Sequence, residues 1–194
     1  MEHKTVGFAV CGSFCTHHRA MEALEAVKAR YDHVIPIVSE VVADTDTRFG
    51  TAHDLMREME RICDHRVIAT QKEAEPIGPK GLLDLLIIAP CTGSTLGKLA
   101  CGIADTTVTL AAKAHLRNER PIVLAVSTND GLAGNAASLG ALLNRRGYYF
   151  VPFGQDSAIK KPRSLVADFP QLPAALAAAL QGQQLQPMLC GART

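Results

Sequence analysis

Short runs of consecutive apolar residues alternate along this chain with longer segments whose apolar residues recur at helical spacing. The runs are almost entirely apolar and predict strands over residues 5–11, 34–38, 67–69, 82–89, 121–126 and 148–152. The segments of helical periodicity predict helices over residues 14–30, 47–63, 94 onward, 107–117, 132–146 and 172–180. Strands that alternate with helices, and are apolar throughout, are typical of a parallel sheet covered on both faces. The pattern therefore predicts an α/β fold.

The length of 194 residues fits one domain of this class, and we predict a single domain over residues 1–194. A segment rich in Pro and Gly, residues 73–81, and a polar, basic segment, residues 157–164, both predict loops. Residues 183–194 follow the last predicted helix. We expect them to form a tail or an arm at an interface.

The charges of the chain nearly cancel, because 20 Lys and Arg residues and 19 Asp and Glu residues leave a formal charge of +1. This balance gives no electrostatic reason to expect nucleic acid or a membrane as a partner. No apolar run approaches the ~20 residues that cross a bilayer. Residues 1–4 lead directly into the first strand without a signal peptide, which predicts a cytoplasmic protein. No Cys and His residues have the spacing of zinc ligands, so we expect no metal site.

The most informative stretch, residues 89–106, begins at the end of a predicted buried strand. Small polar residues, from Thr92 to Thr95, stand where this strand ends and the next helix begins. Ligands of open α/β sheets bind beyond the carboxyl ends of strands. A helix N-terminus at that point offers free N–H groups and a positive partial charge to an anion. The stretch therefore predicts a site for a phosphate-bearing ligand.

Polar residues also follow other predicted strands. Residues 12–14 (Gly-Ser-Phe) follow the first strand, Ser39 ends the second, and residues 127–129 (Ser-Thr-Asn) follow the fifth. Each has an ordinary structural interpretation, since Gly-Ser can cap a helix and Asn129 can form a turn. We expect the loops after the first, fourth and fifth strands to converge at one edge of the sheet. Because the chain lacks both a P-loop and a GxGxxG fingerprint, a mononucleotide such as FMN fits better than NAD.

Two basic segments are candidates for binding an anionic substrate. Arg48 stands beside Phe49, a pair suited to a planar or anionic ligand. Lys160, Lys161 and Arg163 lie in one loop and could form an electropositive rim for a dicarboxylate or for a partner subunit. In both places, solvated surface residues are the alternative interpretation. No acid–base pair can be identified from the sequence, so the catalytic residue stays unassigned.

Residues 90–105 (PCTGSTLGKLACGIAD) resemble the P-A-[ST]-A-N-T-x-x-K-x-A-x-G-x-A-D signature of the FMN-dependent cysteine decarboxylase superfamily. Within this superfamily, the chain is more similar to the family of dipicolinate synthase B subunits, and this resemblance covers residues 4–190. The segments that carry it are residues 7–9, 12–15, 45–50, 73–80, 111–118, 125–132 and 151–156.

The resemblance implies a three-layer αβα sandwich with a mostly parallel, doubly wound sheet of the Rossmann-like or flavodoxin-like kind. It implies a homo-oligomer built as a trimer or a multiple of trimers. It also implies a subunit of the enzyme that oxidises dihydrodipicolinate to dipicolinate (pyridine-2,6-dicarboxylate) in the mother cell during sporulation. A separate dipicolinate synthase A subunit would bind NAD(P), which agrees with the missing dinucleotide fingerprint in this chain.

The polar loops and the resemblance together define a set of candidate residues for binding FMN. By the resemblance, residues 12–14 would contact the flavin phosphate and ring edge, and Asn129 would contact the flavin or a substrate carboxylate. The full set is Gly12, Ser13, Phe14, Ser39, Cys91, Thr92, Ser94, Thr95, Ser127, Thr128 and Asn129.

The chain also departs from the decarboxylase pattern. Pro76 stands where the decarboxylases carry a catalytic His, and proline cannot exchange a proton. Gly93 and Ser94 replace the Ala-Asn pair of the signature. These departures favour an oxidoreductase subunit, with two alternatives left open. One is a non-catalytic subunit that keeps a flavin pocket as a scaffold or regulator, and the other is an FMN-dependent decarboxylase of a cysteinyl substrate.

Overall fold

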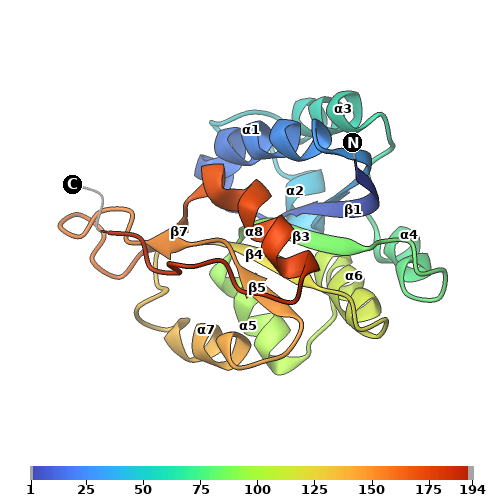
Figure 1. The fold of residues 1–194 in the computed structure, drawn as a ribbon. Coiled ribbons are helices and arrows are strands. Elements are labelled where there is room, and N and C mark those ends of the chain that lie inside the picture. Colours follow the sequence, from blue (N-terminus) through green and yellow to red (C-terminus); the bar gives the residue numbers. More distant parts are fainter. Residues whose placement is uncertain (1, 192–194) are drawn as a thin grey trace.

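The structure is a computed structural model that describes residues 2–191, and its helices and strands alternate along the chain (Figure 1). The strands are β1 (Glu2–Val10), β2 (Tyr31–Val38), β3 (Leu85–Cys91), β4 (Ile122–Thr128), β5 (Tyr148–Phe150), β6 (Phe153–Gly154) and β7 (Leu165–Ala167). The α-helices are α1 (His17–Lys28), α2 (Glu40–Asp44), α3 (Ala52–Cys63), α4 (Gln71–Ala74), α5 (Gly93–Cys101), α6 (Thr107–Leu116), α7 (Ala136–Leu143) and α8 (Leu172–Leu180). Short 3-10 helices are η1 (Phe14–Thr16), η2 (Glu75–Ile77) and η3 (Phe169–Gln171).

The body of the sheet consists of parallel strands in the order β2-β1-β3-β4-β5. Strand β7 pairs antiparallel with the end of β4, and β6 pairs antiparallel with β7. The order of the strands reverses between β1 and β3, as in flavodoxin-like sheets. The predicted mostly parallel, doubly wound α/β fold is therefore confirmed. The reversal point is the place where folds of this kind bind ligands.

Helices cover both faces of the sheet. Helices α1, α3 and α8 pack on one face, and α5, α6 and α7 pack on the other (Figure 1). Neighbouring residues of one strand contribute to different apolar clusters: Phe8 of β1 belongs to the first cluster and Ala9 to the second. Because both faces are buried, the strands are apolar at nearly every position, which explains the continuous apolar runs in the sequence.

The predicted strand over residues 67–69 is wrong in extent. Only Ile68 forms a bridge, to Ile37 of β2. The Ile68 N–H donates to Pro36 O, and its carbonyl accepts from Val38 N, both at 2.9 Å. Pairing stops there because Thr70 begins a capping box with Glu73, which starts helix α4.

Two predicted helices are shorter in the structure. The helix predicted over residues 47–63 begins at Ala52, because the Thr51 hydroxyl accepts from Asp54 N at 3.1 Å and caps the first turn. The helix predicted over residues 132–146 covers only Ala136–Leu143. Helix α2 and the β6–β7 pair were not predicted, since α2 has 5 residues and β6 has 2, too few to show a periodicity.

The segment expected as a tail lies against the sheet as far as the structure describes it. The Gln184 side chain accepts from Phe150 N and donates to Phe150 O, both at 2.8 Å, as a neighbouring strand would. Phe153 N donates to Met188 O, and Cys190 N donates to Phe153 O, both at 2.9 Å. The Gln184 contacts therefore occupy the open edge of β5. Residues 192–194 lie outside the described residues.

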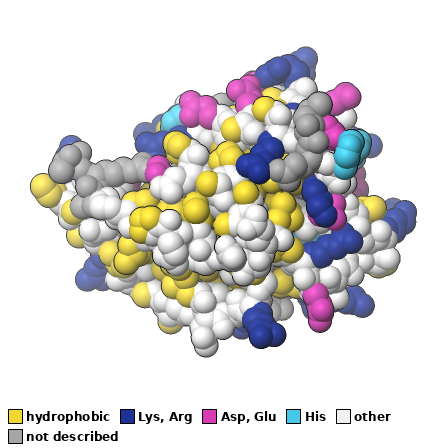
Figure 2. All heavy atoms as spheres, viewed as in Figure 1, with side chains coloured by type: hydrophobic (Ala, Val, Ile, Leu, Met, Phe, Trp, Pro, Cys, Tyr) yellow, Lys and Arg dark blue, Asp and Glu magenta, His cyan; other side chains and the backbone are white. Residues whose placement is uncertain are grey.

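The surface shows no large area of one charge on the face that Figure 2 presents. Basic and acidic side chains are dispersed over this face, both at its rim and inside it, with hydrophobic side chains among them. Among the described residues, no helix is both long enough and apolar enough to cross a lipid bilayer.

Replacing Gln184 tests whether the C-terminal segment stabilises the sheet. We expect Gln184→Ala to lower the free energy of unfolding by about 1–3 kcal/mol, because the backbone groups of the buried Phe150 lose their partners. Urea denaturation measures the change. The neighbouring Gln183 is exposed, and its side chain makes no hydrogen bond within the described chain, so Gln183→Ala is the matched control. Equal stabilities of the two variants would contradict the stabilising role of Gln184 at the edge of β5.

His115 should make stability depend on pH. It is fully buried, its Nε2 lies 2.9 Å from Pro121 O, and burial lowers its pKa from 6.5 to about 4. The unfolded chain therefore binds more protons between these pH values, and stability falls as pH decreases from 6.5 to 4. The loss attributable to this group is roughly 3 kcal/mol. Urea denaturation across this range should show a shallower pH dependence for His115→Gln, and an unchanged slope would contradict the prediction.

Candidate functional site

The carboxyl ends of β1, β3 and β4 open into a cleft of about 750 Å³, which we call the strand-end cleft. Loops that follow three separate strands contribute to it, together with the turn before α3 and the segment between β6 and β7. The convergence expected from the sequence is therefore present in the structure. The predicted residues that line this cleft are Gly12, Ser13, Phe14, Arg48, Thr92, Ser94, Ser127, Thr128, Asn129 and Lys161.

A second cleft of about 510 Å³, the adjoining cleft, lies on the β2 side of the first. The two clefts have Gly12, Phe14, Thr92 and Ser94 in common. Two further predicted residues, Ser39 and Thr95, line only the adjoining cleft. The two clefts together therefore surround the point at which the strand order reverses.

Helix α5 begins at the boundary of the two clefts. Thr92 is its N-cap, and the Thr92 hydroxyl accepts from Thr95 N at 3.1 Å. Gly93 is required at the next position: a Cβ there would lie 2.4 Å from Asn135 Nδ2 and 2.7 Å from Thr128 Oγ1. The first turn of α5 thus faces both clefts, and its amides and positive dipole end are suited to an anion.

A hydrogen bond between two loops fixes the wall of the strand-end cleft. The Ser13 hydroxyl donates to the Ser127 carbonyl at 2.8 Å, which joins the loop after β1 to the end of β4. The Thr16 hydroxyl in turn donates to the Ser13 carbonyl at 2.7 Å. Because the proton of Ser13 Oγ is used inside the protein, this oxygen can only accept a hydrogen bond from a ligand.

Asp130 is the centre of a second polar cluster at the same edge. Its carboxylate accepts from the Thr128 hydroxyl and from Asn135 Nδ2, which lies 2.7 Å from both carboxylate oxygens. These hydrogen bonds lower the pKa of Asp130, and the hydrogen bond from Thr128 has the larger effect. The cluster holds the loop after β4 against the start of α7 and keeps the carboxylate ionised at neutral pH.

Two buried thiols, Cys11 and Cys91, and the buried imidazole of His17 are neutral groups. Burial raises the pKa of Cys11 to about 11 and raises that of Cys91 well above its usual value. Cys91, a predicted flavin contact, is fully buried and lines neither cleft. His17 Nε2 lies 2.8 Å from Cys11 O, and burial lowers the pKa of this imidazole. None of these groups has the ionisation of a nucleophile or a general acid at neutral pH.

Ser39 carries an unsatisfied hydroxyl. Its Oγ is buried and has no hydrogen-bond partner within the described chain, although the residue lines the adjoining cleft. A buried hydroxyl without a partner costs free energy, and a ligand oxygen in the cleft would remove that cost. Ser39 is therefore a candidate for binding a polar group of a ligand in the adjoining cleft.

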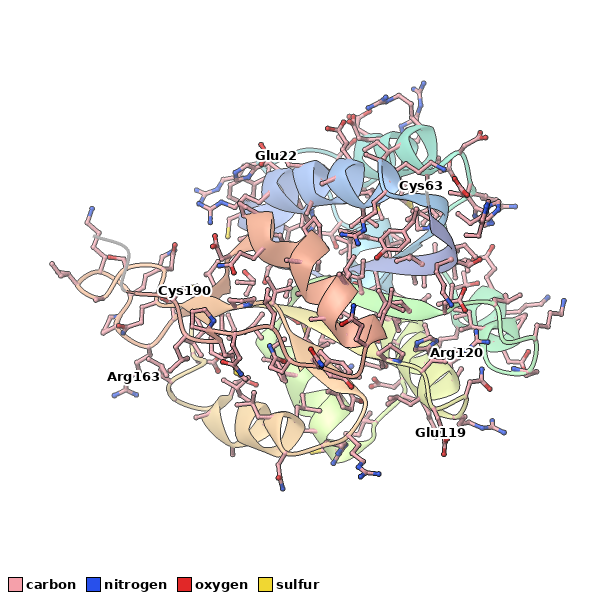
Figure 3. The ribbon with its side chains drawn as sticks, viewed as in Figure 1. Glu22, Cys63, Glu119, Arg120, Arg163 and Cys190 are labelled. Atoms are coloured by element: carbon pink, nitrogen blue, oxygen red, sulfur yellow. The ribbon has the colours of Figure 1, made fainter. Side chains whose placement is uncertain are left out.

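The predicted cationic residues separate into two groups. Arg48 and Lys161 line the strand-end cleft, whereas Lys160 and Arg163 are exposed and lie outside its lining. Arg163 extends outward from its loop (Figure 3). Lys161 Nζ lies 2.6 Å from Asp156 Oδ2, so its charge is already paired. The guanidinium of Arg48 stacks on the ring of Phe49, with 4.8 Å from Cζ to the ring centroid.

Some residues of the strand-end cleft were missed from the sequence. Arg19 lies on the first turn of α1, and Asn135 precedes α7, so neither belongs to a strand-end motif. The short spacing from Ser13 to Arg19 could have indicated that Arg19 lies at the site, because η1 and the start of α1 bring its side chain back to the strand end. Asn135 was predictable only from its pairing with Asp130, which depends on the folded loop.

Comparison with known proteins identifies the family. The flavoprotein family model matches residues 2–141, from β1 into α7. The chain belongs to the flavoprotein family. Within the flavoproteins it is similar to the B subunit of dipicolinate synthase from Bacillus subtilis (strain 168), with 41% identity over 189 residues, which cover 97% of this chain and 94% of that protein.

Solved structures support the same relationship. The crystal structure of the dipicolinate synthase B subunit from Bacillus halodurans C has a TM-score of 0.89 and 40% identity, and the match covers 98% of this chain and 97% of that one. The FMN-dependent cysteine decarboxylase TvaF has a TM-score of 0.67 at 20% identity, and the match covers 93% and 99% of the two chains. This second likeness shows a shared flavoprotein fold. The predicted resemblance to dipicolinate synthase B subunits is therefore confirmed.

Two glycines of α5 provide a paired test of the cleft geometry. We expect Gly93→Ala to destabilise the protein by about 1–3 kcal/mol, because the added methyl group displaces Asn135 from Asp130. Gly97 lies on the same helix, and the nearest atom to its Cβ would be 3.9 Å away. Gly97→Ala should therefore stabilise the helix by up to about 1 kcal/mol. Thermal or urea unfolding compares the two, and equal effects would contradict close packing at Gly93.

Proposed function

We propose that this chain is a subunit of a dipicolinate synthase and contributes to the NAD(P)-linked oxidation of dihydrodipicolinate to dipicolinate. The observation that carries the proposal is the 41% identity to a dipicolinate synthase B subunit over 97% of the chain. A likeness of that extent includes every loop of the strand-end cleft, whereas a shared sheet alone would support only a common fold.

We further propose FMN as the cofactor, held at the two clefts. The fit rests on the unsatisfied Ser39 hydroxyl, on the first turn of α5 and on the strand-order reversal at which flavodoxin-like folds bind FMN. Lys98 is paired with Asp105 at 2.8 Å, so the phosphate would be held by hydrogen bonds from hydroxyl and backbone amide groups. The residues that would hold the cofactor are Gly12, Ser13, Phe14, Ser39, Thr92, Ser94, Thr95, Ser127, Thr128 and Asn129.

The reaction removes a hydride and a proton from a dihydropyridine ring and forms an aromatic product. Bound FMN would supply a two-electron acceptor on this chain, and NAD(P) on the proposed A subunit would serve the same purpose there. The side chains of this chain would bind the substrate carboxylates and hold the reacting C–H bond toward the acceptor. The strand-end cleft is large enough for that positioning role and is lined by cationic residues.

The proposed assembly has two parts, a homo-oligomer and a complex with the A subunit. Large apolar side chains are exposed around the clefts, with Val41 at 51% and Phe49 at 54% exposure. Contacts between copies, in trimers or multiples of trimers, would cover such side chains. We place this assembly in the cytoplasm of the mother cell of a sporulating bacterium.

A non-catalytic subunit is the second candidate function, and the chemistry of the clefts favours it. The described residues that line the strand-end cleft include no His, and Pro76 lies in η2, outside both clefts. The two carboxylates among the described lining residues, Asp130 and Asp156, are already bonded to Thr128 and Asn135 and to Lys161. A chain of this kind could position or regulate the A subunit while keeping a flavin pocket. The absence of a proton-transferring side chain at Pro76 also argues against a cysteine decarboxylase.

The Ser39 hydroxyl tests the cofactor proposal. Ser39→Ala should weaken FMN binding about 2- to 10-fold, the effect of one neutral hydrogen bond. Because the hydroxyl has no partner in the described chain, the same variant should not lower the melting temperature. Flavin fluorescence titration measures the affinity, and Ser138→Ala on α7, outside both clefts, is the control. Unchanged FMN affinity of Ser39→Ala would place the cofactor elsewhere.

Reconstitution tests the catalytic proposal. Purified A subunit and this chain, separately and together, are supplied with dihydrodipicolinate and NAD(P), and dipicolinate is measured by chromatography. We expect full turnover only when both chains are present. Full turnover by the A subunit alone would refute a catalytic contribution and favour the scaffold function.

A further inference from the structure

Two guanidinium groups of the strand-end cleft have no ion-pair partner in the described part of the chain. Arg19 comes from α1 and Arg48 from the turn before α3, and both line the cleft. The other charged residues of the lining already have partners. Lys161 is paired with Asp156, and Asp130 is hydrogen-bonded to Thr128 and Asn135. Asp130 keeps its negative charge, but its oxygens are occupied by Thr128 and Asn135. The cationic groups left free to bind a ligand are therefore the two arginines, which come from separate elements.

The turn that carries Arg48 is rigid. Thr47 N donates to Gly50 O at 3.0 Å, and Gly50 N donates to Thr47 O at 3.1 Å. Gly50 has φ of +142°, a conformation that other residues rarely adopt. The Thr47 hydroxyl also accepts from Phe49 N at 3.1 Å. These hydrogen bonds hold the conformation of the turn within the protein itself.

The guanidinium of Arg48 lies over the Phe49 ring, with Cζ 4.8 Å from the ring centroid. Its N–H groups form no hydrogen bond within the described chain, so all of them are available to a ligand. The planar edge of a guanidinium binds a carboxylate through two parallel hydrogen bonds. Arg48 and Phe49 together present an oriented cation beside a half-exposed aromatic ring at the rim of the cleft.

We propose that Arg19 and Arg48 form a two-point clamp for a small planar dicarboxylate, with one carboxylate bound by each arginine and the ring of the ligand beside Phe49. The identity of the ligand as a pyridine-2,6-dicarboxylate or its dihydro precursor rests on the function proposed above. Because two unpaired arginines come from different elements, the cleft can bind two carboxylates and not only one. Arg19 is a specificity-determining residue in this arrangement, and Lys160 and Arg163 have no part in it.

Binding measurements on the full chain test the clamp directly. The probes are pyridine-2,6-dicarboxylate, pyridine-2-carboxylate and benzene-1,3-dicarboxylate, titrated calorimetrically in metal-free buffer. We expect the unmodified protein to bind both dicarboxylates about 10- to 100-fold more tightly than the monocarboxylate, the usual effect of one charge-assisted hydrogen-bonded pair. Arg19→Gln and Arg48→Gln should each reduce this preference to about 3-fold or less, since either change leaves only one carboxylate bound.

Matched variants and FMN titration separate the clamp from a role of the same arginines in flavin binding. Arg57→Gln and Arg163→Gln remove exposed arginines outside the cleft and should leave all affinities unchanged. FMN affinity should also be unchanged in Arg19→Gln and Arg48→Gln. If these two variants lose FMN affinity and keep the preference for dicarboxylates, the arginines bind the flavin phosphate and the clamp is refuted.

The three probes also distinguish failure of the clamp from failure of the proposed function. Tight binding of benzene-1,3-dicarboxylate without binding of pyridine-2,6-dicarboxylate would support the clamp and refute the dipicolinate synthase function. Binding of pyridine-2,6-dicarboxylate that is insensitive to both arginine substitutions would refute the clamp and leave that function standing. Equal affinity for monocarboxylate and dicarboxylates in the unmodified protein would also refute the clamp.

Discussion

Between β1 and β3 the crossover connections leave the sheet toward opposite faces, so that α1 packs on one face and α5 on the other. The first turns of these helices therefore diverge, and neither can cover the gap above the two strand ends. Both clefts lie at this gap, and the loops that line them are the loops that leave these strands. The location of the site is thus a consequence of the winding of the chain, whereas its chemistry depends on the residues placed in the loops.

Most polar groups at this edge are satisfied by one another. Ser13 is bonded to Ser127, Thr92 caps α5, and Asp130 holds both Thr128 and Asn135. These contacts make the loops rigid and leave few groups available to a ligand. Rigid surroundings favour binding, because little conformational entropy is lost when a ligand arrives. The groups that remain available to hydrogen-bond a ligand are the Ser39 hydroxyl, the amides in the first turn of α5 and the two unpaired arginines.

The fold and the position of the candidate site could be predicted from the sequence because both depend on local patterns. Continuous apolar runs define parallel strands, and small polar residues directly after a run mark a strand end. Arg19 could not be found in this way, since it reaches the cleft only through the path of η1 and α1. Lys160 and Arg163 were expected at the site from charge alone, but charge does not determine the direction in which a loop side chain points. Cys91 lines neither cleft, because it belongs to β3 and its side chain lies in the buried core.

The hydrogen bonding of the outer strands β2 and β5 affects how copies of the chain could associate. Gln184 completes the backbone pairing of β5, and Ile68 completes that of β2 beside Pro36, so both outer strands have part of their hydrogen-bonding capacity used within one chain. A second molecule would have to displace these contacts before it could extend the sheet by adding a strand. In the homo-oligomer proposed above, contacts between copies would therefore form through side-chain surfaces, where geometry can close a ring, and not through the open-ended stacking that leads to fibres.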